Sequence, residues 1–273
     1  MKKLYLFIQK FIKKLGDDGI SAYAAETAFF LIISFFPFVM LLITLLEFLP
    51  ITENVLSILA ERFLPEMIGN FASQMITELA ERANKTVISI TALATLWSAS
   101  RGVFSVVKGL NVSCNVEETR GYIRLRVSSV LYTFVFAVTV LLTLVLLVFG
   151  SHIFEWFANK FVFLKEYAFL LGSRQVIGFI MLSLFFAVLY VFAPNRKTKF
   201  KEEILGAVFA ATGWILFSFA FSFYINNIGN FSYFYGSLTS VVVLMLWLYI
   251  CMYIVFIGAE INVFLKEEKK KNV

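Results

Sequence analysis

The stretch that decides the fold is residues 238–265, LTSVVVLMLWLYICMYIVFIGAEINVFL, in which Glu260 is the only charged side chain. A helix rises about 1.5 Å per residue and the hydrocarbon core of a bilayer is about 30 Å thick, so about 20 apolar residues cross it. The run is longer than that and is continuous rather than alternating, which favours a helix over a strand of a membrane barrel. It therefore predicts a transmembrane helix.

Five further apolar runs share this character. The chain as a whole is 60% hydrophobic and only 15% charged, with a mean hydropathy of +0.84. A soluble fold has too little interior to bury so much apolar surface. We therefore predict an all-α polytopic membrane protein, with a single membrane domain over residues 1–273. The six predicted transmembrane helices span residues 26–49, 87–107, 127–150, 176–193, 204–225 and 238–265.

Two segments outside these runs mix apolar and charged side chains. In residues 2–15, apolar side chains recur every three or four positions and lysines fill the positions between them. This pattern is typical of an amphipathic basic helix on an anionic membrane surface. Residues 53–84 have a similar spacing, and Pro65 suits a first helical turn. They predict one or two amphipathic helices in the first outer loop.

The Lys and Arg residues are distributed unevenly between the two sides of the predicted membrane. One side holds 17 of them: five before residue 20, four in 108–126, four in 196–201 and four after 265. The other side holds six, and Arg101 lies inside a crossing. Because loops rich in Lys and Arg stay in the cytoplasm, we expect both termini to be cytoplasmic. This topology accounts for the net charge of +6, so we expect no nucleic-acid partner.

Three ionisable side chains, Glu26, Arg101 and Glu260, lie within or at the ends of the predicted crossings. A charge at the bilayer centre costs at least about 2.5–3.5 kcal/mol, so each requires an explanation. In the predicted topology all three lie near the cytoplasmic side, and we expect one cluster of two carboxylates around one guanidinium. Asn111 and Asn262 would add amides. Such a cluster would bind a proton, a cation or an anionic head group. The alternatives are that each residue is a helix-end side chain that reaches the membrane surface, or that the three form a fixed clamp between helices.

No pattern in the sequence indicates an enzyme. His152 is the only histidine, and no second ligand lies at metal-binding spacing from it. The sequence contains no phosphate-binding glycine loop, dinucleotide-binding turn or serine nucleophile motif. We therefore expect no catalytic residue, no cofactor and no bound metal.

Several short motifs occur in order along most of the chain, and their residues include Trp97, Pro194, Asn195, Tyr235, Gly236, Trp247, Tyr249 and Gly258. Together these motifs resemble the YihY family of bacterial inner-membrane proteins. That family is also called virulence factor BrkB and was once mislabelled ribonuclease BN. The resemblance implies six transmembrane helices in the bacterial cytoplasmic membrane with cytoplasmic termini, and it implies no settled activity. A ribonuclease would need a metal cluster or an acid and base pair facing water, and the short loops supply neither.

Two functions of different kinds fit the sequence. In the first, the chain is a transporter or lipid-handling protein whose polar cluster binds a small ion or a lipid. Pro and Gly breaks in the first two crossings favour this reading. In the second, the chain is a non-transporting scaffold or envelope-assembly partner, and the outer segment 53–84 docks another envelope protein. Membrane lipids are expected partners in both cases.

Overall fold

The computed structural model describes residues 2–46, 54–63, 65–82, 88–160, 174–227 and 237–271, and within these ranges the chain forms helices and short connections without a strand. The prediction of an all-α protein is therefore confirmed. The helices are α1 (Lys2–Asp17), α2 (Ile20–Leu46), α3 (Asn54–Phe63), α4 (Glu66–Arg82), α5 (Ile88–Ser113), α6 (Tyr122–Lys160), α8 (Arg174–Phe192), α9 (Phe200–Asn227) and α11 (Ser237–Lys271).

Four of the described helices are long and apolar enough to cross a membrane, and they contain the third, fifth and sixth predicted crossings and the described part of the first. The second and fourth predicted crossings, 87–107 and 176–193, fall in α5 and α8, where Gly178–Phe192 is a shorter apolar stretch. The membrane character of the chain is confirmed, and the count of six crossings stays a prediction. The four spans are Ile20–Ile43, Tyr122–Leu141, Phe200–Ile225 and Thr239–Glu267.

Two helix ends differ from the predicted ends because polar side chains find partners inside the bundle. Helix α5 continues past Val107 to Ser113, and Asn111 in the added turns is buried and hydrogen-bonded. Helix α6 begins at Tyr122 rather than Val127, and Arg126 in its first turns is 3% exposed. In the sequence, residues such as Asn111 and Arg126 look like loop residues because they are polar or charged. In the structure they lie within helices, where specific partners compensate their burial.

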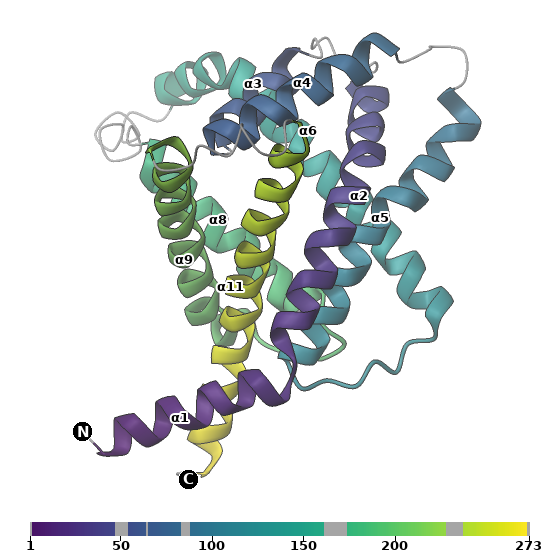
Figure 1. Cartoon of the computed structure of the whole chain (residues 1–273). Coiled ribbons are helices and arrows are strands. Elements are labelled where there is room, and N and C mark those ends of the chain that lie inside the picture. Colours follow the sequence, from purple (N-terminus) through teal and green to yellow (C-terminus); the bar gives the residue numbers. More distant parts are fainter. Residues whose placement is uncertain are drawn as a thin grey trace.

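Figure 1 shows both chain ends at the same end of the helix bundle, where α1 lies across the last turns of α11, while α3 and α4 lie at the opposite end. This arrangement agrees with a topology in which residues 2–15 and the outer segment 53–84 lie on opposite sides of the membrane. Residues 2–15 lie in α1, and the outer segment forms α3 and α4, with Pro65 directly before α4. Which side is cytoplasmic, and how α1, α3 and α4 meet the membrane, stay predictions.

Helix α11 packs against α1, α2, α4, α5 and α9. Its closest approach is to α9, because a Cβ on Gly206 would overlap the carbonyl oxygen of Gly258. On the same face of α9, Ala207, Ala210 and Ala211 are buried in the main apolar core. Small residues let membrane helices bring their backbones together, and this crossing uses them in that way.

Helices α2 and α5 also approach closely, where Leu31 and Ser34 meet Ser98 and Gly102. The backbone N–H of Gly102 donates a hydrogen bond to Ser34 Oγ at 2.8 Å. A Cβ on Gly102 would lie 2.9 Å from a methyl carbon of Leu31. The glycine therefore permits a close helix contact that fixes α2 against α5.

At the end of the bundle opposite the termini, α4 packs onto α9 and α11. Ile68 of α4 lies in a buried cluster with Phe221 of α9 and with Trp247 of α11. The indole Nε1 of Trp247 donates a hydrogen bond to Ser218 Oγ at 3.2 Å. Part of the predicted outer segment is thus seated on the transmembrane helices.

Candidate functional site

The structure gives Glu26 and Glu260 lysine partners rather than Arg101. Glu26 Oε1 lies 2.9 Å from Lys108 Nζ, and Glu260 forms an ion pair with Lys14. Arg101 is exposed on α5 and forms no ion pair within the described ranges. The predicted cluster of two carboxylates around the Arg101 guanidinium is therefore wrong. The reason is that lysines occupy the positions next to both carboxylates. Lys108 lies two turns beyond Arg101 on the same face of α5 and pairs with Glu26, and α1 brings Lys14 to Glu260.

The two predicted amides do not join Glu260 either. Asn262 Nδ2 donates to a carboxylate oxygen of Glu203 at 2.9 Å, and Asn262 Oδ1 accepts from the N–H of Gly206 at 2.7 Å. Residues 260 and 262 are two positions apart, so their side chains point to nearly opposite faces of α11. Asn262 therefore faces α9, and Glu260 faces the side covered by α1.

Glu203 of α9 was not predicted, and it is one of two fully enclosed carboxylates of the described chain. One oxygen accepts hydrogen bonds from Arg196 Nη2 at 2.8 Å and from Thr198 Oγ1 at 2.7 Å, and the other accepts from Asn262. Only 2% of Glu203 is exposed. Because both oxygens have strong donors, this carboxylate is a fixed link between α9, α11 and the segment before α9.

Glu260 is the other enclosed carboxylate, and its surroundings differ. It has no exposed surface. Lys14 forms an ion pair with Oε1, whereas Oε2 has no hydrogen-bond donor among the described residues. Lys14 is itself partly exposed and also binds Asp18 at 3.1 Å. Glu260 therefore keeps unused acceptor capacity, and its partner has a second acceptor near the surface.

Cys114, directly after α5, lies between these two ion pairs. Burial raises the pKa of its thiol to about 12, while the nearby charges of Arg196 and Lys14 act to lower it and Glu203 acts to raise it. The thiol is therefore protonated at neutral pH. Of these neighbours, Lys14 belongs to the ion pair of Glu260, and Arg196 and Glu203 form the other ion pair. We call Lys14, Arg196, Glu203, Glu260 and Asn262 the buried carboxylate cluster.

A second polar network joins the connection between α5 and α6 to the turn after α8. Arg120 donates two hydrogen bonds to Glu118 at 2.7 Å each, and these bonds are the main reason that the pKa of Glu118 is lowered. Asn111 Nδ2 donates to Glu118 at 2.6 Å and its Oδ1 accepts from the N–H of Asn195 at 2.8 Å. Asn111 and Asn195 thus serve to fix two connections beside the cluster.

The other motif residues take structural positions where they are described. Pro194 is buried in the turn after α8. Gly258 lies at the α9 crossing, where a Cβ would lie 2.5 Å from the hydroxyl of Tyr190. Tyr249 stacks on Tyr253 with ring centroids 6.2 Å apart. Trp97 lies beside Arg126, with the guanidinium 4.6 Å from the ring centroid. Tyr235 and Gly236 lie outside the described residues.

Sequence reasoning missed Lys14, although its spacing contains a signal. Lys14 follows Phe7 by seven residues and Phe11 by three, so it lies on the apolar face of α1 rather than on the lysine face. Phe11 packs edge-to-face against Phe264 of α11 with ring centroids 5.4 Å apart. The same face therefore carries Lys14 toward α11.

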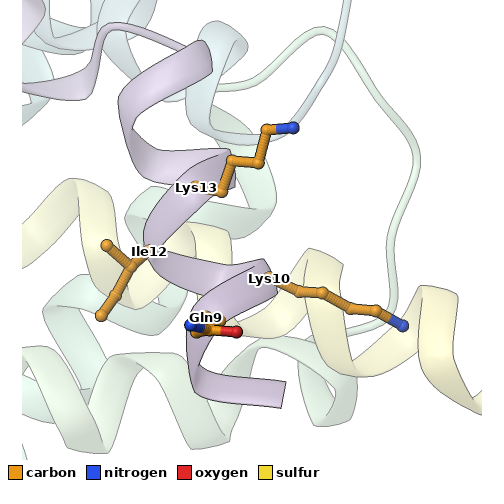
Figure 2. Close-up of a pocket in the computed structure, with 4 residues that line it drawn as sticks. All are labelled: Gln9, Lys10, Ile12 and Lys13. Atoms are coloured by element: carbon orange, nitrogen blue, oxygen red, sulfur yellow. The ribbon is translucent and has the colours of Figure 1, made fainter. Parts of the chain in front are cut away.

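The outer side of α1 carries Lys10 and Lys13. Figure 2 shows a shallow pocket lined by Gln9, Lys10, Ile12 and Lys13, in which Lys10 and Lys13 extend to one side of the helix and Ile12 to the other. Lys10, Ile12 and Lys13 are exposed. No group of three or more His, Cys, Asp or Glu side chains with metal-binding geometry occurs among the residues that the structure describes.

Comparison with known proteins gives one consistent result. The family model for virulence factor BrkB matches residues 11–273. The chain is 36% identical over 253 residues to YfkH of Bacillus subtilis (strain 168), a protein that carries a ribonuclease-like name, with 90% of each chain covered. It is 27% identical to a UPF0761 membrane protein of Pseudoalteromonas atlantica, covering 100% of this chain and 91% of the relative. A UPF0761 membrane protein of Vibrio vulnificus is also 27% identical, over 96% of this chain. No solved structure matches.

Proposed function

We propose that this chain, which belongs to the virulence factor BrkB family of membrane proteins, is a transporter or lipid-handling protein in which Glu260 binds and releases a proton or a small cation. The proposal includes six transmembrane helices in the bacterial cytoplasmic membrane, with both termini in the cytoplasm. Under that topology the buried carboxylate cluster lies near the cytoplasmic surface. The proposal assigns the chain no chemical reaction, and the ribonuclease-like name belongs to the Bacillus relative.

The contrast between the two enclosed carboxylates carries the proposal. Glu203 has donors for both oxygens, whereas Glu260 has Lys14 at Oε1 and no donor at Oε2 from the described chain. A buried carboxylate held only by one flexible ammonium is poorly compensated for its lost hydration. Ionisable groups at membrane depth are, by their cost, the groups that ion and proton pathways use. Glu260 therefore has the environment expected of a carboxylate that binds and releases an ion. Glu203 has the environment of a carboxylate that holds helices together.

Lys14 supplies a way to open this site. When a proton or a cation occupies Glu260, the attraction between the carboxylate and Lys14 falls, and the ammonium can turn to Asp18, which it already contacts at 3.1 Å. Helix α1 would then be held mainly by apolar contacts such as Phe11 on Phe264. Loss of the ion pair would uncover Glu260 on the side of the termini. In this mechanism α1 is a cover whose position depends on the charge of Glu260.

The second candidate function is a non-transporting scaffold. It is favoured by the complete hydrogen bonding of Glu203 and by the seating of α4 on α9 and α11. In this reading the pair of Lys14 and Glu260 is a second clamp. Helices α3 and α4 would then present their outer surface to an envelope protein.

Flux in proteoliposomes tests the proposal and separates the two functions. Three kinds of probe are used. Proton movement is followed by entrapped pyranine, and Na⁺ and K⁺ movement is measured under a concentration gradient. Lipid movement is followed with a fluorescent phosphatidylglycerol whose head group is quenched from outside. Glu260→Gln is compared with Glu26→Gln, a matched control because Glu26 also pairs with a lysine but is partly exposed. Each variant is checked for thermal stability before reconstitution.

We expect wild type and Glu26→Gln to move at least one probe, and Glu260→Gln to move it at least about tenfold more slowly. A Glu260→Gln protein that transports at the wild-type rate contradicts the proposal. The scaffold function is supported instead if no probe moves and Glu260→Gln unfolds at a clearly lower temperature.

A further inference from the structure

We infer that Arg126 and Arg101, between α5 and α6, form a binding site for the phosphate of an anionic lipid head group. This site lies on different helices from the buried carboxylate cluster and does not depend on the function proposed for Glu260. Its core is an arginine that is buried among aromatic rings and that has no carboxylate partner in the described chain.

Arg126 is held in one orientation by neighbouring groups. Its Nη2 donates a hydrogen bond to the carbonyl oxygen of Trp97 at 2.5 Å. Its guanidinium lies 4.6 Å from the ring centroid of Trp97 and 5.7 Å from that of Phe104. Aromatic faces attract a guanidinium but leave its in-plane N–H donors available. The rings therefore fix Arg126 without neutralising its charge.

The donor capacity of Arg126 is incompletely used. Only 3% of the residue is exposed, and Nε has no hydrogen-bond acceptor among the described residues. A buried unsatisfied donor costs free energy, and the cost is greater when the donor is charged. An acceptor from outside the chain that reached Nε would remove this cost.

Arg101 adds a second positive charge at the same place. It follows Trp97 by one helical turn in α5 and is exposed, and the Trp97 carbonyl that Arg126 binds points along the helix axis toward residue 101. No described carboxylate pairs with either arginine. Two neighbouring cations without a counterion favour an anion between them. Guanidinium groups bind phosphate oxygens particularly well because their donors match the spacing of those oxygens.

The surface around the two arginines identifies the source of the phosphate as a lipid. Tyr122, Ile123 and Val127 on α6 are between 57% and 76% exposed, so the site is bordered by apolar surface. Tyr122 begins the candidate span Tyr122–Leu141, which places Arg126 about 6 Å along the helix from the start of that span. A long arginine side chain at this depth reaches the head-group layer, and an exposed tyrosine is typical of the same layer.

Native mass spectrometry of the purified full chain tests the site, with added phosphatidylglycerol as the anionic lipid and phosphatidylcholine as the neutral one. The variants are Arg101→Gln and Arg126→Gln. Arg124→Gln is the matched control, because Arg124 is exposed on α6 but points away from Arg126. Inorganic phosphate, added alone, tests whether a free anion is enough. Arg101 is exposed, so Arg101→Gln keeps the test decisive if Arg126→Gln fails to fold.

We expect wild type and Arg124→Gln to bind phosphatidylglycerol in preference to phosphatidylcholine, and Arg101→Gln to bind it about tenfold more weakly. Glu260→Gln should bind like wild type. Equal phosphatidylglycerol affinity in Arg101→Gln and Arg124→Gln would overturn the site. Inorganic phosphate that binds as tightly as phosphatidylglycerol would overturn the assignment to a lipid.

Discussion

Lys14 in the surface helix α1 forms an ion pair with Glu260 in α11, a glutamate with no exposed surface. The pair connects the two ends of the chain, which meet at one end of the bundle (Figure 1). Lys14 also contacts Asp18, so its ammonium has an alternative acceptor within its own helix region. Because Lys14 can exchange Glu260 for Asp18, this ion pair is suited to covering and uncovering Glu260.

Glu203→Gln should reduce the thermal stability of the protein much more than Glu260→Gln does. Removing the charge of Glu203 leaves Arg196 without its buried partner, and breaking such a pair costs about 3–5 kcal/mol. Removing the charge of Glu260 leaves Lys14 free to bind Asp18 or water. Unfolding followed by tryptophan fluorescence in detergent measures both. Equal losses in the two variants would show that Glu260 is a clamp like Glu203.

Cys114 should report the position of α1. Because burial raises the pKa of its thiol to about 12, very little thiolate is present at pH 8, and a maleimide should label it very slowly. Lys14→Gln should raise the labelling rate several-fold because release of α1 admits water to the thiol. The measurement uses a Cys251→Ser background, with the exposed Lys10→Gln as control. The same rate in both lysine variants would rule out a cover formed by α1.

Gly206→Ala should be among the most disruptive single-methyl changes in this chain. The added methyl group would overlap the carbonyl oxygen of Gly258, and neither backbone can move without separating α9 from α11. Overpacking of this kind costs about 1–3 kcal/mol or more. Gly178→Ala is the matched control, because its Cβ meets no atom within 4 Å. Thermal unfolding should show a large loss for the first variant and little change for the second.

The fold was predictable from the sequence because the bilayer imposes a length and a composition on every helix that crosses it. The apolar run 238–265 and the apolar spacing in residues 2–15 both correspond to helices in the structure, as α11 and α1. The turns that continue α5 to Ser113 were not predictable, because their polar residues look like loop residues until their partners are known.

The candidate site was predictable only in part. Glu260 stood out because a charge at membrane depth is costly, and it is fully buried. Its partner depends on how α1 packs on α11, which no local pattern specifies. Arg126 was counted with the loop cations, since its burial depends on the rings of Trp97 and Phe104 from another helix. The sequence therefore identifies residues whose burial costs free energy, but not the contacts that offset this cost.

Glu118 should make the folded protein lose stability at acid pH. Because its pKa is lowered in the folded state, mainly by hydrogen bonds from Arg120, its contribution is fully present above the unfolded pKa of about 4.3. The contribution is lost as the pH falls through the lower folded pKa. The difference in unfolding temperature between wild type and Glu118→Gln should be constant from pH 8 to about pH 5 and then shrink. A difference that grows on acidification would contradict this account.

The central claim is that transport requires the carboxylate of Glu260, and that this carboxylate does more than hold helices together. The most direct test compares Glu260→Asp with Glu260→Gln in proteoliposomes, using whichever probe the wild type moves and equal amounts of folded protein. We predict that Glu260→Asp, which keeps the carboxylate, retains measurable flux, while Glu260→Gln of similar thermal stability retains none. Flux through Glu260→Gln at the rate of Glu260→Asp would contradict the claim.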